Sequence, residues 1–275
     1  MMNDRWMRDG IGAWILLFGP AMLPALLGCG GSKQGGMRSG GTTLGSEQVV
    51  TCPEPGDNAE EVEEAKLYFE HNSTDEDTGF HGLVGQDGWS RLCVFDPNGI
   101  QILGIQPSGS LGELGMADIF FESREPRHAE VAVISHFSAF PEGVYQIRGV
   151  TYDGEGFTGE AWVTHDVPRG AVITHPADEA VIPPRGLVVT WEPVTTGIDG
   201  EPIEVTGYQV ILTNEEAEDP HGWARPIYDV HVPPGVTGLA VPDEFLEPDT
   251  VYEIEVLAIE VSGNQTISTI FFTTR

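Results

Sequence analysis

Short apolar runs separated by turn-forming residues occur throughout the chain from residue 59 onward. The clearest example is at residues 92–95 and 100–103, two apolar runs on either side of Asp96-Pro97-Asn98-Gly99. These turn residues favour a tight reversal of the chain, so the segment predicts a β-hairpin. Two more hairpins are predicted on the same grounds: residues 67–69 with 80–84, and residues 144–147 with 161–163.

Residues 130–140 depart from this pattern. Val131, Ile134 and Phe137 recur at the spacing of a helix face, and Pro141 follows as a helix terminator. We expect a short helix that covers one end of a β-sandwich formed by residues 59–167. This domain resembles no named family.

Residues 168–275 also consist of short strand-like segments with glycine and proline between them. Six strands are predicted: residues 187–191, 207–212, 227–232, 238–241, 251–259 and 266–272. A seventh strand near Val172 or Val181 would complete the set. Alternation favours sheets with one buried face, so the chain is predicted to be mainly β, with two β-sandwich domains.

The sequence Leu246-Glu247-Pro248-Asp249-Thr250-Val251-Tyr252, together with Trp191 and Tyr208, resembles the immunoglobulin-like fibronectin type III family. The resemblance covers residues 168–275. It implies that Tyr252 forms a tyrosine corner, with its hydroxyl bonded to upstream backbone and its ring in the core. Seven large side chains are expected in the core rather than in a ligand site: Trp191, Tyr208, Leu246, Tyr252, Ile254, Val256 and Phe271.

The first 28 residues have the features of an export signal. Residues 11–27 are apolar and uncharged, and they follow a head that contains Arg5 and Arg8. Leu26-Leu27-Gly28-Cys29 resembles the lipobox of bacterial lipoproteins, which implies cleavage before Cys29 and lipidation of its sulfur. An uncleaved transmembrane anchor is the alternative, but prolines interrupt the apolar run and it is short for a bilayer span.

Residues 29–58 are predicted to be a flexible tether because residues 30–45 are rich in glycine and serine. Gly30 follows the lipidated cysteine, where some lipoproteins carry an aspartate that retains them in the inner membrane. The resemblance to lipoproteins therefore implies a location in the bacterial cell envelope, at the outer membrane.

The charge of the chain excludes one class of partner. The sequence has 43 Asp and Glu residues against 13 Lys and Arg, a formal net charge of −30 at pH 7. Such a chain repels nucleic acid. The excess either forms a hydrated surface that keeps the protein soluble or attracts divalent cations or basic partners, and we favour the first interpretation.

Cys52 and Cys93 remain after Cys29 is assigned to the lipid. An even pair in an oxidising compartment is expected to form a disulfide. Two buried or idle thiols are the alternative, because spacing alone does not establish the geometry.

One local cluster suggests metal binding. It comprises His71, Asn72, Asp75, Asp77 and His81. Asp75 and Asp77 stand at alternate positions, as in part of a calcium loop, but the glycine and the distal glutamate of an EF-hand are missing. We favour a solvated turn over calcium, and two histidines do not make a tetrahedral zinc site. No cofactor is expected.

The sequence contains no nucleophile elbow, and Ser135-His136 and Thr164-His165-Asp166 are neighbours in sequence only. The acidic segment 214–226, which contains His221 and Trp223, is either a binding loop or an exposed insertion. We predict a non-catalytic, lipid-anchored envelope protein, a spacer or docking module for protein or polysaccharide. The alternative is a lipid-anchored hydrolase or metal-binding accessory protein that uses residues 59–167.

Overall fold

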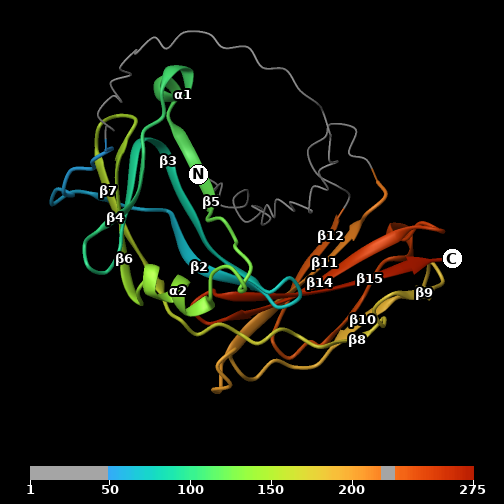
Figure 1. Cartoon of the computed structure of the whole chain (residues 1–275). Coiled ribbons are helices and arrows are strands. Elements are labelled where there is room, and N and C mark those ends of the chain that lie inside the picture. Colours follow the sequence, from blue (N-terminus) through green and yellow to red (C-terminus); the bar gives the residue numbers. More distant parts are fainter. Residues whose placement is uncertain (1–48, 218–226) are drawn as a thin grey trace, which may run out of the picture.

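The computed structural model describes residues 49–217 and 227–275 (Figure 1). These residues form two domains built almost entirely from β-strands, as predicted. The signal segment, Cys29, His221 and Trp223 lie outside the described residues. Within the described ranges, no helix is both long and apolar enough to span a bilayer.

The N-terminal domain contains seven strands and two short helices. They are β1 (Glu60–Glu61), β2 (Glu64–Asn72), β3 (Asp77–Phe95), β4 (Gln101–Ile105), α1 (Gly109–Leu114), β5 (Met116–Glu122), α2 (Val133–Ala139), β6 (Gly143–Thr151) and β7 (Gly156–Val163). The three predicted hairpins correspond to β2–β3, β3–β4 and β6–β7.

The long strand β3 connects the two layers of this domain. Its first half pairs with β2 and β5, and its second half pairs with β4 and β6. The register shifts around Trp89, close to Gly88, whose positive φ of 66° suits glycine. Both layers bury apolar side chains in one core: Leu67, Phe69, Phe80, Val84, Trp89, Leu92, Val94, Tyr145, Ile147, Phe157, Ala161, Val163 and Val167.

Local chemistry explains the best-defined hairpin. One carboxylate oxygen of Asp96, Oδ1, accepts hydrogen bonds from the backbone N–H of Asn98 (2.9 Å) and Ile100 (2.7 Å). Gly99 supplies the positive φ (78°) that closes the turn. The helix α2 also lies within the predicted segment, and its Phe137 contacts the ring of Phe69 with centroids 5.1 Å apart.

The C-terminal domain is a sandwich of two sheets, in the strand orders β13-β10-β8 and β12-β11-β14-β15. Its elements are β8 (Ile173–His175), β9 (Ala180–Ile182), β10 (Val188–Trp191), β11 (Val205–Asn214), β12 (Ile227–Val232), β13 (Gly238–Ala240), the 3-10 turn η1 (Asp243–Phe245), β14 (Val251–Glu260) and β15 (Gln265–Thr274). Both positions considered for the first strand are strands. The strand β8 joins the three-stranded sheet, whereas β9 pairs in parallel with β15.

Tyr252 forms the corner that the fibronectin type III resemblance implies. Its buried hydroxyl donates to the carbonyl of Phe245 (3.2 Å) and accepts from the N–H of Glu247 (2.7 Å). Trp191 and Tyr208 meet edge to face in the same core, with centroids 5.4 Å apart. This corner and the two-sheet arrangement give residues 168–275 a fibronectin type III-like fold.

The expectation that Phe271 lies in the core is wrong. Phe271 is 43% exposed, whereas Phe272 is 1% exposed and stacks on Tyr252. Successive residues of a strand point to opposite faces, and the register of β14 and β15 pairs Tyr252 with Phe272. A register one residue away from the expected one therefore exchanges the two phenylalanines.

One sheet runs through both domains. The strand β2 pairs in parallel with β15, so that Glu70, His71 and Asn72 lie opposite Gln265, Thr266 and Ile267. The resulting order is β1-β7-β6-β3-β2-β15-β14-β11-β12. Figure 1 shows β2 of the first domain lying beside the red strands of the second.

Candidate functional site

The junction of the two domains is organised around the side chain of Asn264, which is fully buried. Its Oδ1 accepts from the N–H of Phe69 (2.8 Å), and its Nδ2 donates to the carbonyls of Thr164 (3.1 Å) and Asp166 (3.0 Å). Glu260 holds the turn in place by accepting from the N–H of Asn264 (2.9 Å). One amide thus satisfies backbone groups of β2 and of the segment between the domains.

Further bonds extend this junction along β15. Ser73 donates its N–H (2.9 Å) and its hydroxyl (2.7 Å) to the carbonyl of Ile267. The hydroxyl of Thr266 donates to the carbonyl of Pro168 (2.5 Å), and Thr74 Oγ1 accepts from the N–H of Thr269 (2.9 Å). The two domains are therefore fixed to each other by strand pairing and by side-chain bonds.

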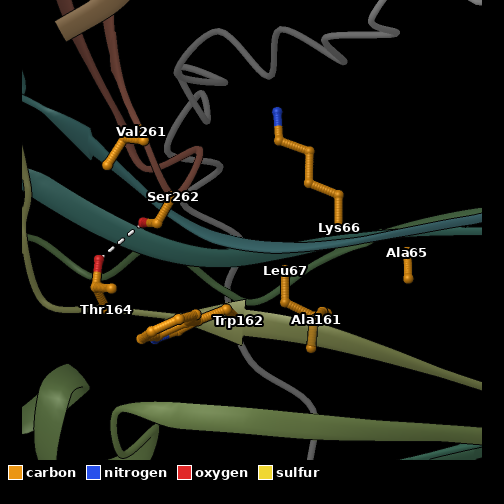
Figure 2. Close-up of a pocket in the computed structure, with 8 residues that line it drawn as sticks. All are labelled: Ala65, Lys66, Leu67, Ala161, Trp162, Thr164, Val261 and Ser262. Atoms are coloured by element: carbon orange, nitrogen blue, oxygen red, sulfur yellow. Dashed lines mark hydrogen bonds between the residues drawn. The ribbon is translucent and has the colours of Figure 1, made fainter.

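A shallow groove of about 360 Å³ opens beside this junction (Figure 2). Its lining residues are Ala65, Lys66, Leu67, Ala161, Trp162, Thr164, Val261 and Ser262. Trp162 is 68% exposed and Val261 is 69% exposed, while Thr164 and Ser262 are joined through their hydroxyls (2.8 Å). The Lys66 amine points away from Trp162 in Figure 2. The groove thus presents an indole and an aliphatic side chain to solvent, which suits contact with a partner.

The residues of the predicted metal cluster do not converge. His71 is buried, with Nδ1 3.0 Å from Thr78 Oγ1 and its ring stacked on that of His128. Burial, and then the proximity of His128, lower the pKa of His71 to about 4. His81 lies on the opposite face of the β2–β3 hairpin, because it pairs with Tyr68 while His71 pairs with Thr78.

Asp75 and Asp77 lie in and just after the β2–β3 turn. Asn72 Oδ1 accepts from the N–H of Thr74 (2.9 Å) and Asp75 (3.0 Å), and Asn72 Nδ2 donates to the Asp75 carboxylate (3.2 Å). Burial, and then the charges of Glu125 and Asp75, raise the pKa of Asp77 to about 6. This arrangement is a hydrogen-bonded turn of the kind that aspartate and asparagine favour.

A different set of ligand atoms does come together. Within residues 49–217 and 227–275, one group of three potential metal ligands has its atoms within 4.8 Å of one another: Glu70, His81 and Glu125. His81 Nε2 lies 2.7 Å from Glu125 Oε1, and Glu70 accepts a hydrogen bond from Gln265 of the other domain. Glu70 and His81 are buried, whereas Glu125 is exposed.

The electrostatics of this group are dominated by its carboxylates. Burial, and then the charges of Glu125 and Glu122, raise the pKa of Glu70. Burial opposes the charged form of His81, but its hydrogen bond to the Glu125 carboxylate and the charges of Glu70, Glu125 and Glu122 raise its pKa overall. The group gathers negative charge around one imidazole, so it has the chemistry to hold a cation.

Of this group, His81 belongs to the cluster predicted from the sequence, whereas Glu70 and Glu125 do not. In the predicted β2–β3 hairpin, the alternation of side chains places Glu70 on the same face as His81, so Glu70 could have been added to the predicted cluster from the sequence. Glu125 follows β5, a strand that was not predicted, and it reaches His81 because β5 pairs with β3. Only the fold brings it there.

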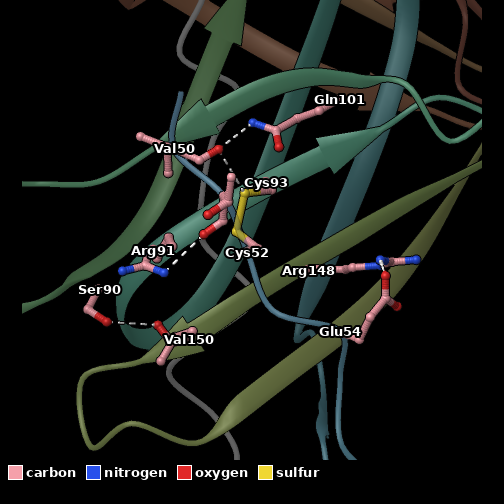
Figure 3. Close-up of a disulfide and its surroundings, with 10 residues drawn as sticks. Val50, Cys52, Glu54, Ser90, Arg91, Cys93, Gln101, Arg148 and Val150 are labelled. Atoms are coloured by element: carbon pink, nitrogen blue, oxygen red, sulfur yellow. Dashed lines mark hydrogen bonds and ion pairs between the residues drawn. A yellow bond between two sulfur atoms is a disulfide. The ribbon is translucent and has the colours of Figure 1, made fainter. Parts of the chain in front are cut away.

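Cys52 and Cys93 are joined by a disulfide in the structure, with their Cα atoms 5.9 Å apart (Figure 3). Gln101 donates to the carbonyl of Val50 (2.7 Å), and Arg148 pairs with Glu54 (2.5 Å). Residues 50–54, which composition assigns to the tether, are therefore held against β3, β4 and β6.

The histidines of the two chance motifs serve as packing groups. His165 Nε2 lies 2.9 Å from the carbonyl of Phe140, and its ring stacks on Phe137. His136 is buried in α2, and its Nε2 has no hydrogen-bond partner within the described part of the chain. Neither arrangement holds a nucleophile beside a base.

No family model matches the sequence, and no curated protein matches it. Among solved structures, the chain is similar to the FN1–FN3 domains of chicken CNTN1, at 17% identity and a TM-score of 0.31. That match covers 79% of this chain and 65% of the other, so the chain spans less than two thirds of the CNTN1 chain. A redesigned β-sandwich protein is also similar, at 23% identity and a TM-score of 0.27, over 40% of this chain and 96% of the other. The strand order of the C-terminal domain and its Tyr252 corner are those of a fibronectin type III-like fold.

Proposed function

We propose that the chain is a non-catalytic, lipid-anchored protein of the bacterial envelope that serves as a rigid spacer and docking module. The observation that carries the proposal is the sheet shared by the two domains through β2 and β15. Domains joined only by a linker move relative to each other by default. A sheet that continues across the junction instead gives the pair one fixed orientation.

The anchor in this proposal is Cys29, in the lipobox-like sequence Leu26-Leu27-Gly28-Cys29. A lipid at that position and the glycine-rich segment that follows would hold the two domains near the outer membrane. The acidic composition of the chain, with a formal net charge of −30, supports a hydrated surface outside the cytoplasm.

The docking surface in this proposal is the groove around Trp162 and Val261. Both side chains are more than two thirds exposed, although they are large and apolar. A partner that covered them would gain the free energy of burying this surface, and an indole can also stack on a sugar ring or an aromatic side chain. The groove suits a protein or a polysaccharide.

The anchor is tested by fractionating cells that produce the Cys29→Ala variant. We expect the variant to leave the membrane fraction and to lose incorporation of a labelled fatty acid. A variant that stays in the membrane with its label would contradict the anchor.

The docking role is tested by returning the released Cys29→Ala protein to isolated envelopes. We expect Trp162→Ala in that background to weaken binding at least about fivefold, because a central exposed aromatic often carries about 1 kcal/mol or more. Tyr152→Ala is the matched control, since Tyr152 is also an exposed aromatic but does not line the groove. Equal loss in both variants, or none in either, would contradict docking at the groove. Protease or glycosidase treatment of the envelopes distinguishes a protein partner from a polysaccharide.

The alternative of a metal-binding accessory protein gains support from Glu70, His81 and Glu125, whose ligand atoms converge. The alternative of a hydrolase gains none from His136 or His165, which are packed as described above.

A further inference from the structure

We propose that Glu70, His81 and Glu125 bind a divalent transition-metal cation of the zinc class at the junction of the two domains. This site does not depend on the lipid anchor or on the Trp162 groove, so it can be tested apart from the proposed function. It also differs from the sequence-predicted cluster, with which it shares only His81.

The fold holds the three ligands from three different segments. Glu70 lies on β2, His81 lies on β3 opposite Tyr68, and Glu125 follows the end of β5, which pairs with β3. Their ligand atoms lie within 4.8 Å of one another. Ligands that stand about 2.0–2.2 Å from a tetrahedral ion are about 3.4 Å apart. Small side-chain movements are therefore enough to close the group around an ion.

The donor set selects the class of ion. One imidazole nitrogen and two carboxylate oxygens form a mixed set that suits zinc and its neighbours. Calcium prefers six or more oxygen ligands, whereas an imidazole offers only nitrogen, so this set does not suit calcium. Three protein ligands leave a fourth position for water.

Gly79 supports the site from the neighbouring backbone. A Cβ at position 79 would lie 2.9 Å from His81 Nε2 and closer still to Glu125 Oε1. The missing side chain is what allows the Glu125 carboxylate to face the imidazole. Gly79 does not have a positive φ, so its backbone conformation does not require glycine. The space that it leaves for the Glu125 carboxylate is therefore the reason for a glycine at this position.

Gln265 supports the site from the other domain. Its side-chain amide donates to the Glu70 carboxylate, and the two residues lie opposite each other in the β2–β15 pairing. Metal-ligating carboxylates are commonly held by such an outer hydrogen bond. The C-terminal domain thus orients a ligand that belongs to the N-terminal domain.

A His81–Glu125 ion pair at 2.7 Å is the simpler explanation for part of this geometry. An ion pair between His81 and Glu125, however, has no need for a second carboxylate, and Glu70 is buried beside it. Glu70 and Glu125 bring two carboxylates to one imidazole in a partly buried place, and a divalent cation between the three groups would balance their charge.

The test is a zinc titration of the metal-stripped, untagged full chain in detergent, in competition with a chromophoric chelator. We expect one equivalent of Zn²⁺ to bind, and calcium in excess to leave it in place. Glu70→Gln, Glu125→Gln and Gly79→Ala should each weaken zinc binding at least about tenfold, the effect usual for losing a ligand or its support.

Glu122→Gln is the matched control, because Glu122 lies opposite His81 in the β3–β5 pairing but outside the ligand group. It removes the same charge and should change zinc affinity less than about threefold. Asp75→Asn with Asp77→Asn should be equally silent. Thermal unfolding without metal checks that each variant folds. If Glu70→Gln does not fold, Glu125→Gln decides, because Glu125 is exposed.

The proposal is overturned if no stoichiometric zinc binds to the parent chain, or if calcium displaces zinc. It is also overturned if Glu122→Gln weakens binding as much as Glu125→Gln, since that would show diffuse attraction rather than ligation. In either case membrane anchoring and envelope binding should be unaffected, so the proposed function would stand or fall separately.

Discussion

Among single residues, Tyr252 has a buried hydroxyl that contributes to the free energy of unfolding. It bonds to the carbonyl of Phe245 and to the N–H of Glu247, and it has no access to water. Removing the oxygen would leave both backbone groups without this partner. Such groups are costly inside a protein because nothing replaces the lost bond.

We therefore expect Tyr252→Phe to lower the free energy of unfolding by about 1–3 kcal/mol. Urea unfolding followed by fluorescence measures the change. Tyr152→Phe is the control, because Tyr152 is largely exposed and should tolerate the change. An unchanged midpoint for Tyr252→Phe would mean that its hydroxyl has no role in the corner.

Glu255 gives a prediction about pH. Its side chain is buried on β14, and burial, followed by the charges of Glu253 and Glu70, raises its pKa to about 8. Between the unfolded pKa, about 4.3, and pH 8, the unfolded chain loses this proton while the folded chain keeps it. Stability from this group is thus complete at low pH and declines as pH rises toward 8.

The variant Glu255→Gln removes this decline. It should match the parent chain below about pH 4 and be more stable by at least about 1 kcal/mol above pH 8, because a neutral amide carries no charge to bury. Melting temperatures across this range measure the difference. A variant that is less stable than the parent at high pH would show that the carboxylate is stabilised in the fold.

At the scale of elements, hairpins were predictable and distant pairings were not. The turn at Asp96-Pro97-Asn98-Gly99 is formed by residues that favour turns and bond to one another locally, and the Tyr252 corner has a sequence motif. Both could therefore be predicted from the sequence. The strand β5 was missed because residues 116–122 lack strict alternation, and with it the position of Glu125 was missed. Phe271 was assigned to the wrong face because the register of β15 depends on β14.

The disulfide is the element-scale feature that is simplest to test. It joins residues 41 positions apart and holds residues 50–54 against the sheet. In the loop-entropy model, closing a loop of this length stabilises the folded state relative to the unfolded chain by about 3–4 kcal/mol. We expect Cys52→Ser with Cys93→Ser to lower the free energy of unfolding by about this amount, measured by guanidinium unfolding.

Reduction of the parent chain should have the same effect, and Cys29→Ala alone should have none. Hydrogen exchange adds a local measure, since residues 50–54 should lose protection first. Unaltered stability after reduction would indicate that the Arg148–Glu54 pair and the Gln101 bond hold this segment without the disulfide.

At the scale of the whole molecule, the junction was invisible to sequence inspection for a physical reason. Asn264 and Phe69 are separated by 195 residues, and no local pattern marks an asparagine whose side chain will bond to three backbone groups at the junction. The pairing of β2 with β15 could not be predicted for the same reason, because the partner of a strand depends on how the side chains of the whole fold pack.

We expect Asn264→Ala to lower the free energy of unfolding by about 2–4 kcal/mol and to uncouple the domains, because several buried groups lose their partner together. Calorimetry should then show two transitions in place of one, and small-angle scattering should show a broader distribution of domain orientations. Asn98→Ala, in an exposed turn, is the control. One sharp transition at the parent temperature would show that strand pairing alone couples the domains.

The pairing of β2 with β15 also has a consequence for how the chain matures. The strand β2 is made early and its neighbour β15 spans Gln265–Thr274, so the completed first domain presents an open edge until the second domain has been synthesised. Unpaired edges recruit other strands and promote aggregation. Synthesis that stops before β15 is made would therefore leave this edge of the first domain unpaired and prone to aggregation.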